Sequence, residues 1–256
     1  TNTSNTQEKK IKNLIYKNYF FKDDKFDIDL IKDLNSSNKI LISISPKNDK
    51  DIVSNLFEEN FKNNDFDWVT YLSATSVYGD KKGRWIDEKS IAQPTSKNGI
   101  ARLNAEKKWL KFFYDFNLPI QIFRLSGIYS LENNVFKRLK MGTLKIVEKK
   151  NHFFSRIHVE DIAKVLTISL KKFSPGQIFN ISDNYPCSNE EVARYAANLM
   201  QMTLPKKIKP EDLESEMLRN FYKDSKRVSN ERMKNFFGYQ LKYPTFIEGL
   251  NVIRDH

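Results

Sequence analysis

Polar residues between positions 75 and 90 offer the first chemistry that the chain could perform. Asp87 and Glu88 are paired carboxylates, as general acid and base catalysis requires, but neighbours on a loop seldom face one another, so a solvated turn is the better interpretation. Tyr78 could act as a base only beside a fixed cation, and no spacing in the sequence supplies one. Asp161 is expected to cap a helix. The 3 histidines are scattered, so we expect no metal site.

Strand-length apolar segments alternate with amphipathic segments in the first half of the chain. The predicted elements are strands at 39–45, 68–73 and 120–125, and helices at 51–61 and 97–114. This order is typical of a parallel sheet with helices on both faces. Such a sheet would bring Ala74, Asn98 and Arg102 together at one mouth.

The pattern loosens after residue 130. We predict a strand at 177–182. Ser188 and Glu191 then form a capping box that begins a helix, and Thr245 and Glu248 repeat this device before the last helix. These elements are typical of a smaller α/β unit that follows the sheet.

Composition bounds the class of protein. The chain has 256 residues, of which 39% are hydrophobic, enough for one large α/β domain or for a nucleotide-binding domain with a cap. No apolar run approaches the roughly 20 residues of a membrane span, and no signal segment opens the chain. The single cysteine, Cys187, excludes an internal disulfide and fits a reducing compartment, so we expect a cytoplasmic protein.

The formal net charge of +11 raises the question of a nucleic-acid partner. The lysines are spread along the whole chain, and the short clusters at 149–150 and 206–209 lack neighbouring aromatics in a recognisable binding module. A solvated basic surface is therefore the better interpretation, and we expect no nucleic acid. A small anionic substrate is compatible with this charge.

Five motifs occur in a fixed order along the chain. They read YLSATSVYGD (71–80), WIDE (85–88), PTSKNGIARLNAE (94–106), FRLSGIY (123–129) and FSRIHVEDIA (154–163). Together with the tail segments at 178–188 and 241–250, they resemble the extended short-chain dehydrogenase/reductases, in an atypical subgroup that is NAD-dependent epimerase/dehydratase-like. The resemblance covers about residues 39 to 250.

This resemblance implies a Rossmann-like, doubly wound parallel sheet whose first strand and helix are missing. We expect a truncated NAD(P)-binding domain over residues 1–130 and a substrate-binding cap over 131–256, with some cap elements returning to the sheet. The family opens with a glycine-rich turn for the cofactor pyrophosphate, but the first glycine here is Gly79. We therefore expect the chain alone to bind a dinucleotide poorly, as a fragment of a longer protein; the alternative is a protein that never bound one.

The family mechanism needs a Tyr-x-x-x-Lys pair, which moves a proton while hydride moves to or from the nicotinamide, and a Ser or Thr that hydrogen-bonds the reacting oxygen. Alignment on the motifs places Asn98, Arg102 and Ala74 at these positions. Asn98 has no proton to exchange near neutral pH, and Ala74 has no hydroxyl. The resemblance thus implies a degenerate site, with Thr75, Tyr78, Asn98 and Arg102 as the candidate catalytic set.

The resemblance also implies contacts to a cofactor. Ser43, Ser45 and Ser73 lie at predicted strand ends, and with Arg102 they are the candidate residues for binding NAD or NADP in the full-length protein. The choice between the two dinucleotides stays open, because the residues that select the 2′-phosphate would lie where the sequence begins.

Two arginines are the candidate substrate-binding residues. The family uses arginines of the cap to hold a nucleotide diphosphate, which suits the planar guanidinium, so we assign this role to Arg156 and Arg227, with solvated surface as the alternative. Gly127 stands where many relatives carry a substrate-contacting Asn, which counts against a sugar nucleotide.

Three hypotheses follow for function. The first is an NAD(P)-dependent oxidoreductase or isomerase that acts on a small anionic substrate, such as a nucleotide sugar, through a non-standard site. The second is a non-catalytic nucleotide-binding sensor or regulatory protein of the same fold, which the loss of the usual acid and base favours. The third, binding of nucleic acid, is the weakest. No membrane partner is expected, and the oligomeric state, a homodimer included, stays open.

Overall fold

The structure, a computed structural model, describes residues 7–11, 14–47, 49–214 and 216–255; residues 1–6, which begin the polar opening segment, lie outside the described residues. The elements up to residue 130 are β1 (Gln7–Ile11), β2 (Leu14–Asn18), β3 (Phe21–Lys22), β4 (Lys25–Phe26), α1 (Asp29–Ser36), β5 (Lys39–Ile42), α2 (Ile52–Leu56), α3 (Glu58–Asn63), β6 (Trp68–Ala74), η1 (Thr75–Tyr78), β7 (Trp85–Ile86), α4 (Lys97–Phe116), β8 (Ile120–Leu125) and β9 (Gly127–Tyr129).

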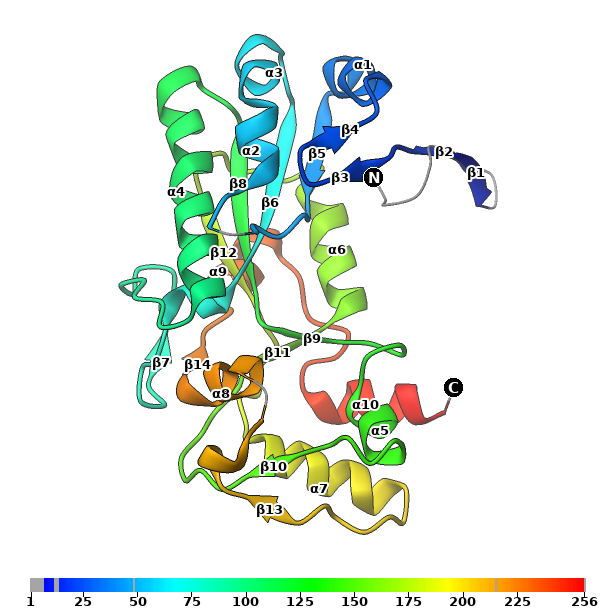
Figure 1. The fold of residues 1–256 in the computed structure, drawn as a ribbon, viewed down its shortest axis with the longest axis vertical. Coiled ribbons are helices and arrows are strands. Elements are labelled where there is room, and N and C mark those ends of the chain that lie inside the picture. Colours follow the sequence, from blue (N-terminus) through cyan, green and yellow to red (C-terminus); the bar gives the residue numbers. More distant parts are fainter. Residues whose placement is uncertain (1–6, 12–13, 48, 215, 256) are drawn as a thin grey trace.

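The elements after residue 130 are the remaining helices, which lie beside the sheet or in the cap, and several short strands (Figure 1). They are α5 (Val135–Lys140), β10 (Ile146–Val147), β11 (Arg156–His158), α6 (Val159–Ser169), β12 (Ile178–Ile181), α7 (Asn189–Leu199), β13 (Lys207–Ile208), η2 (Pro210–Asp212), α8 (Glu216–Lys223), β14 (Arg227–Val228), α9 (Glu231–Phe237) and α10 (Phe246–Arg254).

A four-stranded parallel sheet in the order β12-β8-β6-β5 forms the centre of the molecule. Its register pairs Ile40 with Val69, and Tyr71 with Ile122. These strands are the ones predicted from the apolar segments, so the predicted α/β fold with a parallel sheet is confirmed. Because all four strands run in one direction, their carboxyl ends lie along the same edge.

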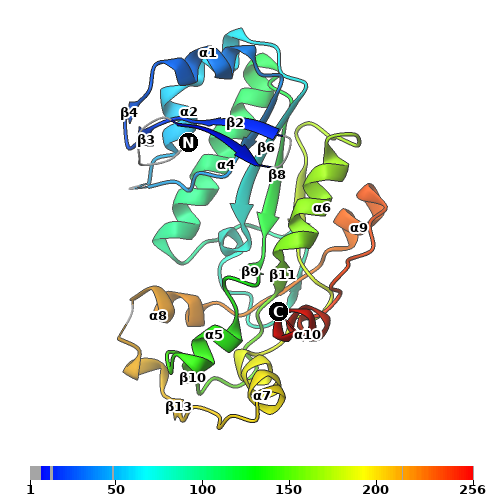
Figure 2. The same cartoon turned by 90° about the vertical axis from the view of Figure 1, so that its right-hand side faces the viewer.

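Helices cover both faces of the sheet, as Figures 1 and 2 show, with α2, α3 and α4 on one face and α6 and α9 on the other. Alternate strand residues point to opposite faces. Val69 and Tyr71 of β6 join the buried cluster of α4, whereas Leu72 packs with the cluster of α6 and α9. The buried face of α4 centres on Trp109, whose side chain is fully buried.

The predicted helix at 51–61 differs from the structure in one respect. It is divided into α2 and α3 at Phe57, whose backbone leaves helical values (φ −114°, ψ 21°). At this break the Phe57 ring packs against Phe26, with ring centroids 5.0 Å apart. The predicted helix at 97–114 forms as α4, which ends where Asn117 adopts a left-handed conformation (φ 58°).

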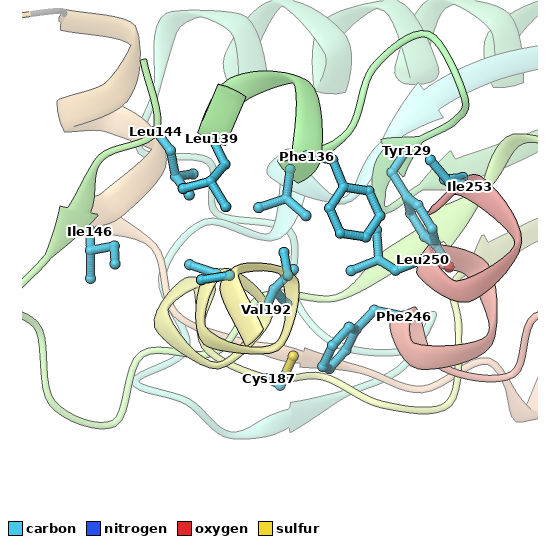
Figure 3. Packing of buried hydrophobic residues seen from close by; sticks show 14 residues of the cluster. Tyr129, Phe136, Leu139, Leu144, Ile146, Cys187, Val192, Phe246, Leu250 and Ile253 are labelled. Atoms are coloured by element: carbon cyan, nitrogen blue, oxygen red, sulfur yellow. The ribbon is translucent and has the colours of Figure 1, made fainter. Parts of the chain in front are cut away.

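A second group of elements lies beyond the carboxyl edge of the sheet, and we call it the cap: α5, β10, α7, β13, α8 and α10 (Figure 1). Its core joins α5, α7 and α10, and Figure 3 shows Phe136, Val192 and Phe246 turned toward one another. Thr245 and Glu248 form the predicted capping box of α10. The cap therefore has a buried core of its own beside the sheet.

Candidate functional site

A cavity of about 740 Å³ lies between the carboxyl edge of the sheet and the cap. The sheet side contributes Thr75, Ser76, Lys97, Asn98 and Arg102 to its wall. The opposite side contributes Arg138, Arg156, Asn189, Asp224 and Lys226. Clefts of this kind, at the strand ends of an open α/β sheet, are the usual place for a ligand.

The first turn of α4 is held close to the end of β6. Ser96 begins the helix by accepting a hydrogen bond from the Gly99 amide (3.1 Å). A Cβ on Gly99 would lie 2.8 Å from the Ser76 carbonyl oxygen and 2.9 Å from Pro94 Cβ, so glycine permits this approach. The helix thereby presents Asn98 to the cavity, beside Thr75 of η1.

Arg102 lies one turn further along α4 and connects two strands. Its Nη1 donates to the Leu72 carbonyl oxygen (2.7 Å), and its Nη2 donates to Ser45 Oγ (2.6 Å). Both acceptors are neutral, and no carboxylate of the described residues forms an ion pair with the guanidinium, so its positive charge remains available at the carboxyl edge of the sheet. Three of the four candidate catalytic residues, Thr75, Asn98 and Arg102, thus line one cavity.

Two buried hydroxyls lie at the ends of neighbouring strands. Ser73, the penultimate residue of β6, and Ser126, directly after β8, have side-chain oxygens without a hydrogen-bond partner among the described residues. Such groups are rare in protein interiors. Arg102 and Ser45, joined by a hydrogen bond at this edge, suit the hydroxyl-rich ribose of a nucleotide, whereas neither Ser73 nor Ser126 is among the residues that line the cavity. Ser43 is exposed, with no such contact in the part of the chain that the structure describes.

A glycine-rich turn for a dinucleotide pyrophosphate is not formed by residues 1–78, since Gly79 is the first glycine. The described residues therefore fit the ribose end of a dinucleotide, and the fit does not extend to its pyrophosphate.

Tyr78 lies outside this cavity. Its ring is fully buried, its hydroxyl donates to Asn180 Oδ1 (2.8 Å), and the Arg124 guanidinium stacks over it at 4.7 Å. Burial raises the pKa of Tyr78 to about 12, although Arg124 and Asn180 act in the opposite direction. In this environment the phenol stays protonated and packs between η1 and the sheet.

Arg156 does line the cavity. Its Nη2 donates to Asn189 Oδ1 (2.5 Å), and its Nη1 donates to the carbonyl oxygens of Phe154 (3.1 Å) and Cys187 (3.2 Å). These contacts orient the guanidinium without neutralising it. Its charge is therefore available to an anion in the cavity.

Arg227, the second predicted substrate-binding arginine, is placed differently. Its guanidinium lies 3.6 Å from the ring centroid of Phe153 and donates to the Gly83 carbonyl oxygen (2.8 Å). It is not among the residues that line the cavity, whereas its neighbour Lys226 is. The structure thus brings Arg156 to the cavity and leaves Arg227 in the β7–β14 contact.

Among the charged residues of the cavity wall, sequence reasoning missed Arg138, Asp224 and Lys226. Arg138, in α5, has no hydrogen bond or ion pair to its guanidinium from any residue that the structure describes, and partial burial with the neighbouring Arg156 lowers its pKa. The only available signal for Lys226 was the Asp-Ser-Lys spacing at 224–226, which is too common to identify a site.

Other classes of site find no support in the described part of the chain. No group of three or more metal-ligating side chains occurs there. Within the same residues, no helix combines the length and apolar character needed to cross a membrane.

Comparisons with known proteins identify the family. No family model matches the chain. The chain is 36% identical to a conserved protein of unknown function from Silicibacter pomeroyi, over 87% of this chain and 79% of that one, and the two structures agree with a TM-score of 0.81. It is also 26% identical over 162 residues to dTDP-D-glucose 4,6-dehydratase of Dictyostelium discoideum, which covers 55% of this chain. The chain belongs to the atypical extended short-chain dehydrogenase/reductases.

A more distant member of this fold is the UDP-glucuronic acid 4-epimerase of Bacillus cereus, solved in complex with NAD. The two proteins are 17% identical, over 90% of this chain and 78% of the epimerase, and their structures agree with a TM-score of 0.70. At that identity the likeness establishes the Rossmann-like fold. The chain spans about two fifths of the curated dehydratases that it matches, 37% of the Dictyostelium enzyme and 42% of the human one.

Proposed function

We propose that the protein binds NAD or NADP and acts as an oxidoreductase or isomerase on a small anionic substrate, with a non-standard set of active-site residues. The observation that carries this proposal is the charge of the cavity. Against the single carboxylate of Asp224, its wall holds five cationic side chains, those of Lys97, Arg102, Arg138, Arg156 and Lys226. A cleft lined by one sign of charge attracts and retains ligands of the other sign.

The sheet side of the cavity is the proposed place of the nicotinamide half of the cofactor. Arg102, with Ser45 Oγ hydrogen-bonded to it, would hold its ribose. When bound, the nicotinamide would supply or accept hydride. Support comes from the Bacillus cereus epimerase, which shares the fold and was solved with NAD.

The cap side is the proposed place of the substrate anion. Arg138 and Arg156 face the same cavity, and neither guanidinium is paired with a carboxylate among the described residues. A diphosphate suits two such donors, because guanidinium and phosphate match in geometry as well as in charge. A nucleotide sugar is the substrate class that the dehydratase and epimerase relatives favour. The cytoplasm expected from the single cysteine is part of the same proposal.

A non-catalytic nucleotide sensor is the second candidate. It is favoured by Asn98, which stands at the Tyr position without an exchangeable proton, and by Tyr78, which is buried outside the cavity. Such a sensor would bind a nucleotide in the cavity, and a partner protein would respond to the bound state.

Titration with NADH and NADPH, followed by fluorescence, tests the proposal on protein expressed from its complete coding sequence. We expect binding that Arg102→Ala weakens by about tenfold or more, because a charged group loses its hydrogen bonds. Lys164→Ala, an exposed position on α6, is the matched control and should bind as the wild type does. Absence of any dinucleotide binding would contradict both candidate functions.

Turnover separates the two candidates. A panel of nucleotide sugars incubated with either dinucleotide should give product if the protein is an enzyme, and binding without product supports the sensor. The double variant Asn98→Tyr, Arg102→Lys sharpens this test, because it restores the family's usual pair. Hydride transfer that appears only in the double variant would show a degenerate site.

A further inference from the structure

Lys226 is a buried ammonium on the wall of the cavity. Lys226 is 9% exposed and lines the cavity together with Ser76 and Asn98. Its Nζ donates to the Gly79 carbonyl oxygen (2.9 Å) and lies 3.3 Å from Asp224 Oδ2. A lysine in such a place is costly to bury, so its retention needs a partner or a function.

The segment that carries Lys226 is fixed on both sides. Asp224 accepts a hydrogen bond from Thr95 Oγ1 (2.6 Å), just before α4. The Ser225 amide donates to Asp80 Oδ1 (2.9 Å), and Ser225 Oγ donates to the Asn151 carbonyl oxygen (3.1 Å). These contacts tie the segment to the loops that follow β6 and precede β11, so the position of the ammonium is defined before any ligand binds.

One N–H of Lys226 remains for a ligand. An ammonium has three donors, of which Gly79 and Asp224 take two, and the described residues offer no third acceptor. Asp224 also balances the charge, so this last donor suits a neutral oxygen, such as a hydroxyl or a carbonyl. Arg138 has no acidic partner among the described residues and suits a full anion instead. The cavity thus holds two kinds of cation.

Lys226 lines the same cavity as Asn98, the residue that stands at the position of the family's tyrosine. Gly79, whose carbonyl it contacts, bonds back to Ser76 through its amide (3.2 Å), and the Ser76 carbonyl faces Gly99 in the first turn of α4. Asn98 lies in that same turn. A substrate atom beside Asn98 would therefore lie at the end of the cavity that Lys226 borders.

We propose that Lys226 contacts the substrate, donating its third N–H to a hydroxyl or carbonyl oxygen at the end of the cavity formed by Ser76 and Asn98. This inference rests on the proposed function, because it takes the substrate to occupy this cavity. It assigns to a residue of the 224–228 segment the proton-bearing role that Asn98 does not fill.

The electrostatic surroundings agree with this role. Burial lowers the pKa of Lys226, while Asp224 and Asp80 act to raise it and Lys81 acts to lower it. The balance brings the amine closer to neutrality than a surface lysine, so that Nζ can release and regain a proton at lower pH.

Pyridoxal 5′-phosphate is a suitable probe, since it joins an anion to an aldehyde. The neutral amine of a lysine attacks the aldehyde carbon, water leaves and a C=N bond forms, which borohydride then reduces to a stable secondary amine. At a limiting amount of reagent near pH 7, peptide mapping should find Lys226 labelled several-fold faster than Lys164, an exposed lysine on α6. Inorganic pyrophosphate should slow the labelling of Lys226 and leave that of Lys164 unchanged.

Two variants guard against a merely structural effect. Asp224→Asn removes the counter-charge, so the amine should lose its proton more readily and the labelling at position 226 should become faster. Lys226→Met keeps the aliphatic stem and should abolish that label while Lys164 reacts as before. Labelling of Lys97 at the same cavity without labelling of Lys226 would overturn the proposal. Dinucleotide titration on the same samples reports separately on the proposed function, which can fail while Lys226 is still labelled.

Discussion

Arg124 and Arg138 are the same residue type in two regions that use positive charge in opposite ways. Arg124, in β8, is buried and donates to both carboxylate oxygens of Glu106, at 2.6 to 3.2 Å, while its guanidinium stacks on Tyr78. Arg138, in α5, lines the cavity and has no carboxylate beside it in the described part of the chain. The first charge is compensated within the fold, and the second is available to a ligand.

This difference gives a criterion for the other cationic side chains of the cavity, namely whether a carboxylate balances their charge. Within the described residues, Arg102 and Arg156 donate to neutral acceptors, namely carbonyl, hydroxyl and amide oxygens and the Cys187 sulfur, which orient a guanidinium and leave its charge in place. Lys226 is intermediate, since Asp224 balances its charge and leaves one donor free. Arg124, which is paired with a carboxylate, serves the fold, whereas Arg102, Arg138 and Arg156 of the cavity wall have no such partner among the described residues and are available to a ligand.

The largest expected effect comes from breaking the paired region. The side chains of Glu106 and Arg124 are 1% and 5% exposed, respectively. Glu106→Gln leaves the buried Arg124 without its counter-charge and should therefore lower the free energy of unfolding by about 3 to 5 kcal/mol. Urea unfolding measures this loss. Glu58→Gln, which removes a partly exposed partner of Lys108, is the matched control and should cost less than about 1 kcal/mol. Equal losses in the two variants would contradict the comparison.

A pH effect is expected at His152, which lies beside the segment that carries Lys226. Burial lowers the pKa of His152 to about 4, and its Nε2 lies 2.9 Å from the Asp224 carbonyl oxygen. An unfolded histidine titrates near 6.5, so unfolding takes up a proton between pH 6.5 and 4. This contribution to stability is fully present above pH 6.5 and is lost as the pH falls through about 4, by no more than about 3 kcal/mol in all.

His152→Gln isolates that contribution, because an amide can still donate to the Asp224 carbonyl without titrating. Asp183 acts with the opposite sign, since burial raises its pKa to about 7, and it is common to both proteins. The difference between wild type and variant in urea unfolding at pH 7 and pH 4.5 therefore reports on His152. Parallel pH profiles would refute the assignment.

Arg138→Ala tests the unpaired region. Because no partner among the described residues loses a contact, the free energy of unfolding should change by less than about 0.5 kcal/mol. The affinity for UDP, measured by calorimetry, should fall by about tenfold or more, as expected for a charged hydrogen bond. Lys137 lies beside Arg138 in α5 and forms an exposed ion pair with Glu132. Lys137→Ala is the control and should leave UDP binding unchanged. Lost stability with unchanged affinity would reverse the roles given to the two arginines.

The smallest effect is expected for Tyr78→Phe. Removal of the hydroxyl leaves Asn180 Oδ1 without its donor and should cost about 1 kcal/mol of stability, with unchanged affinity for NADH and UDP. A loss of turnover without a loss of stability would instead place Tyr78 in the reaction.

Much of the fold could be predicted from the sequence, because its signals are local. The predominantly apolar segments of β6 and β8 follow from burial of the sheet on both faces, and the Thr245–Glu248 capping box is a contact within one turn. Asp161 shows where such reasoning ends. It was expected to cap a helix, but His158 is the N-cap of α6, while the Asp161 carboxylate accepts bonds from the Tyr239 hydroxyl (2.6 Å) and the Lys242 amide (2.8 Å).

The candidate site was predicted in part for the same reason. Thr75, Asn98 and Arg102 belong to motifs with fixed spacing, and the parallel sheet brings them to one edge. Arg138 and Lys226 carry no such spacing, because they reach the cavity through α5 and the 224–228 segment. Their roles depend on which carboxylates lie nearby, and contacts between distant segments leave no periodic trace in a sequence.

The most direct test of the account is a crystal structure of the protein with UDP bound. We expect the diphosphate between Arg138 and Arg156 in the cavity at the carboxyl edge of the sheet, with both guanidinium groups within hydrogen-bond distance of its oxygens. Diphosphate bound elsewhere, with this cavity filled only by water, would contradict the account.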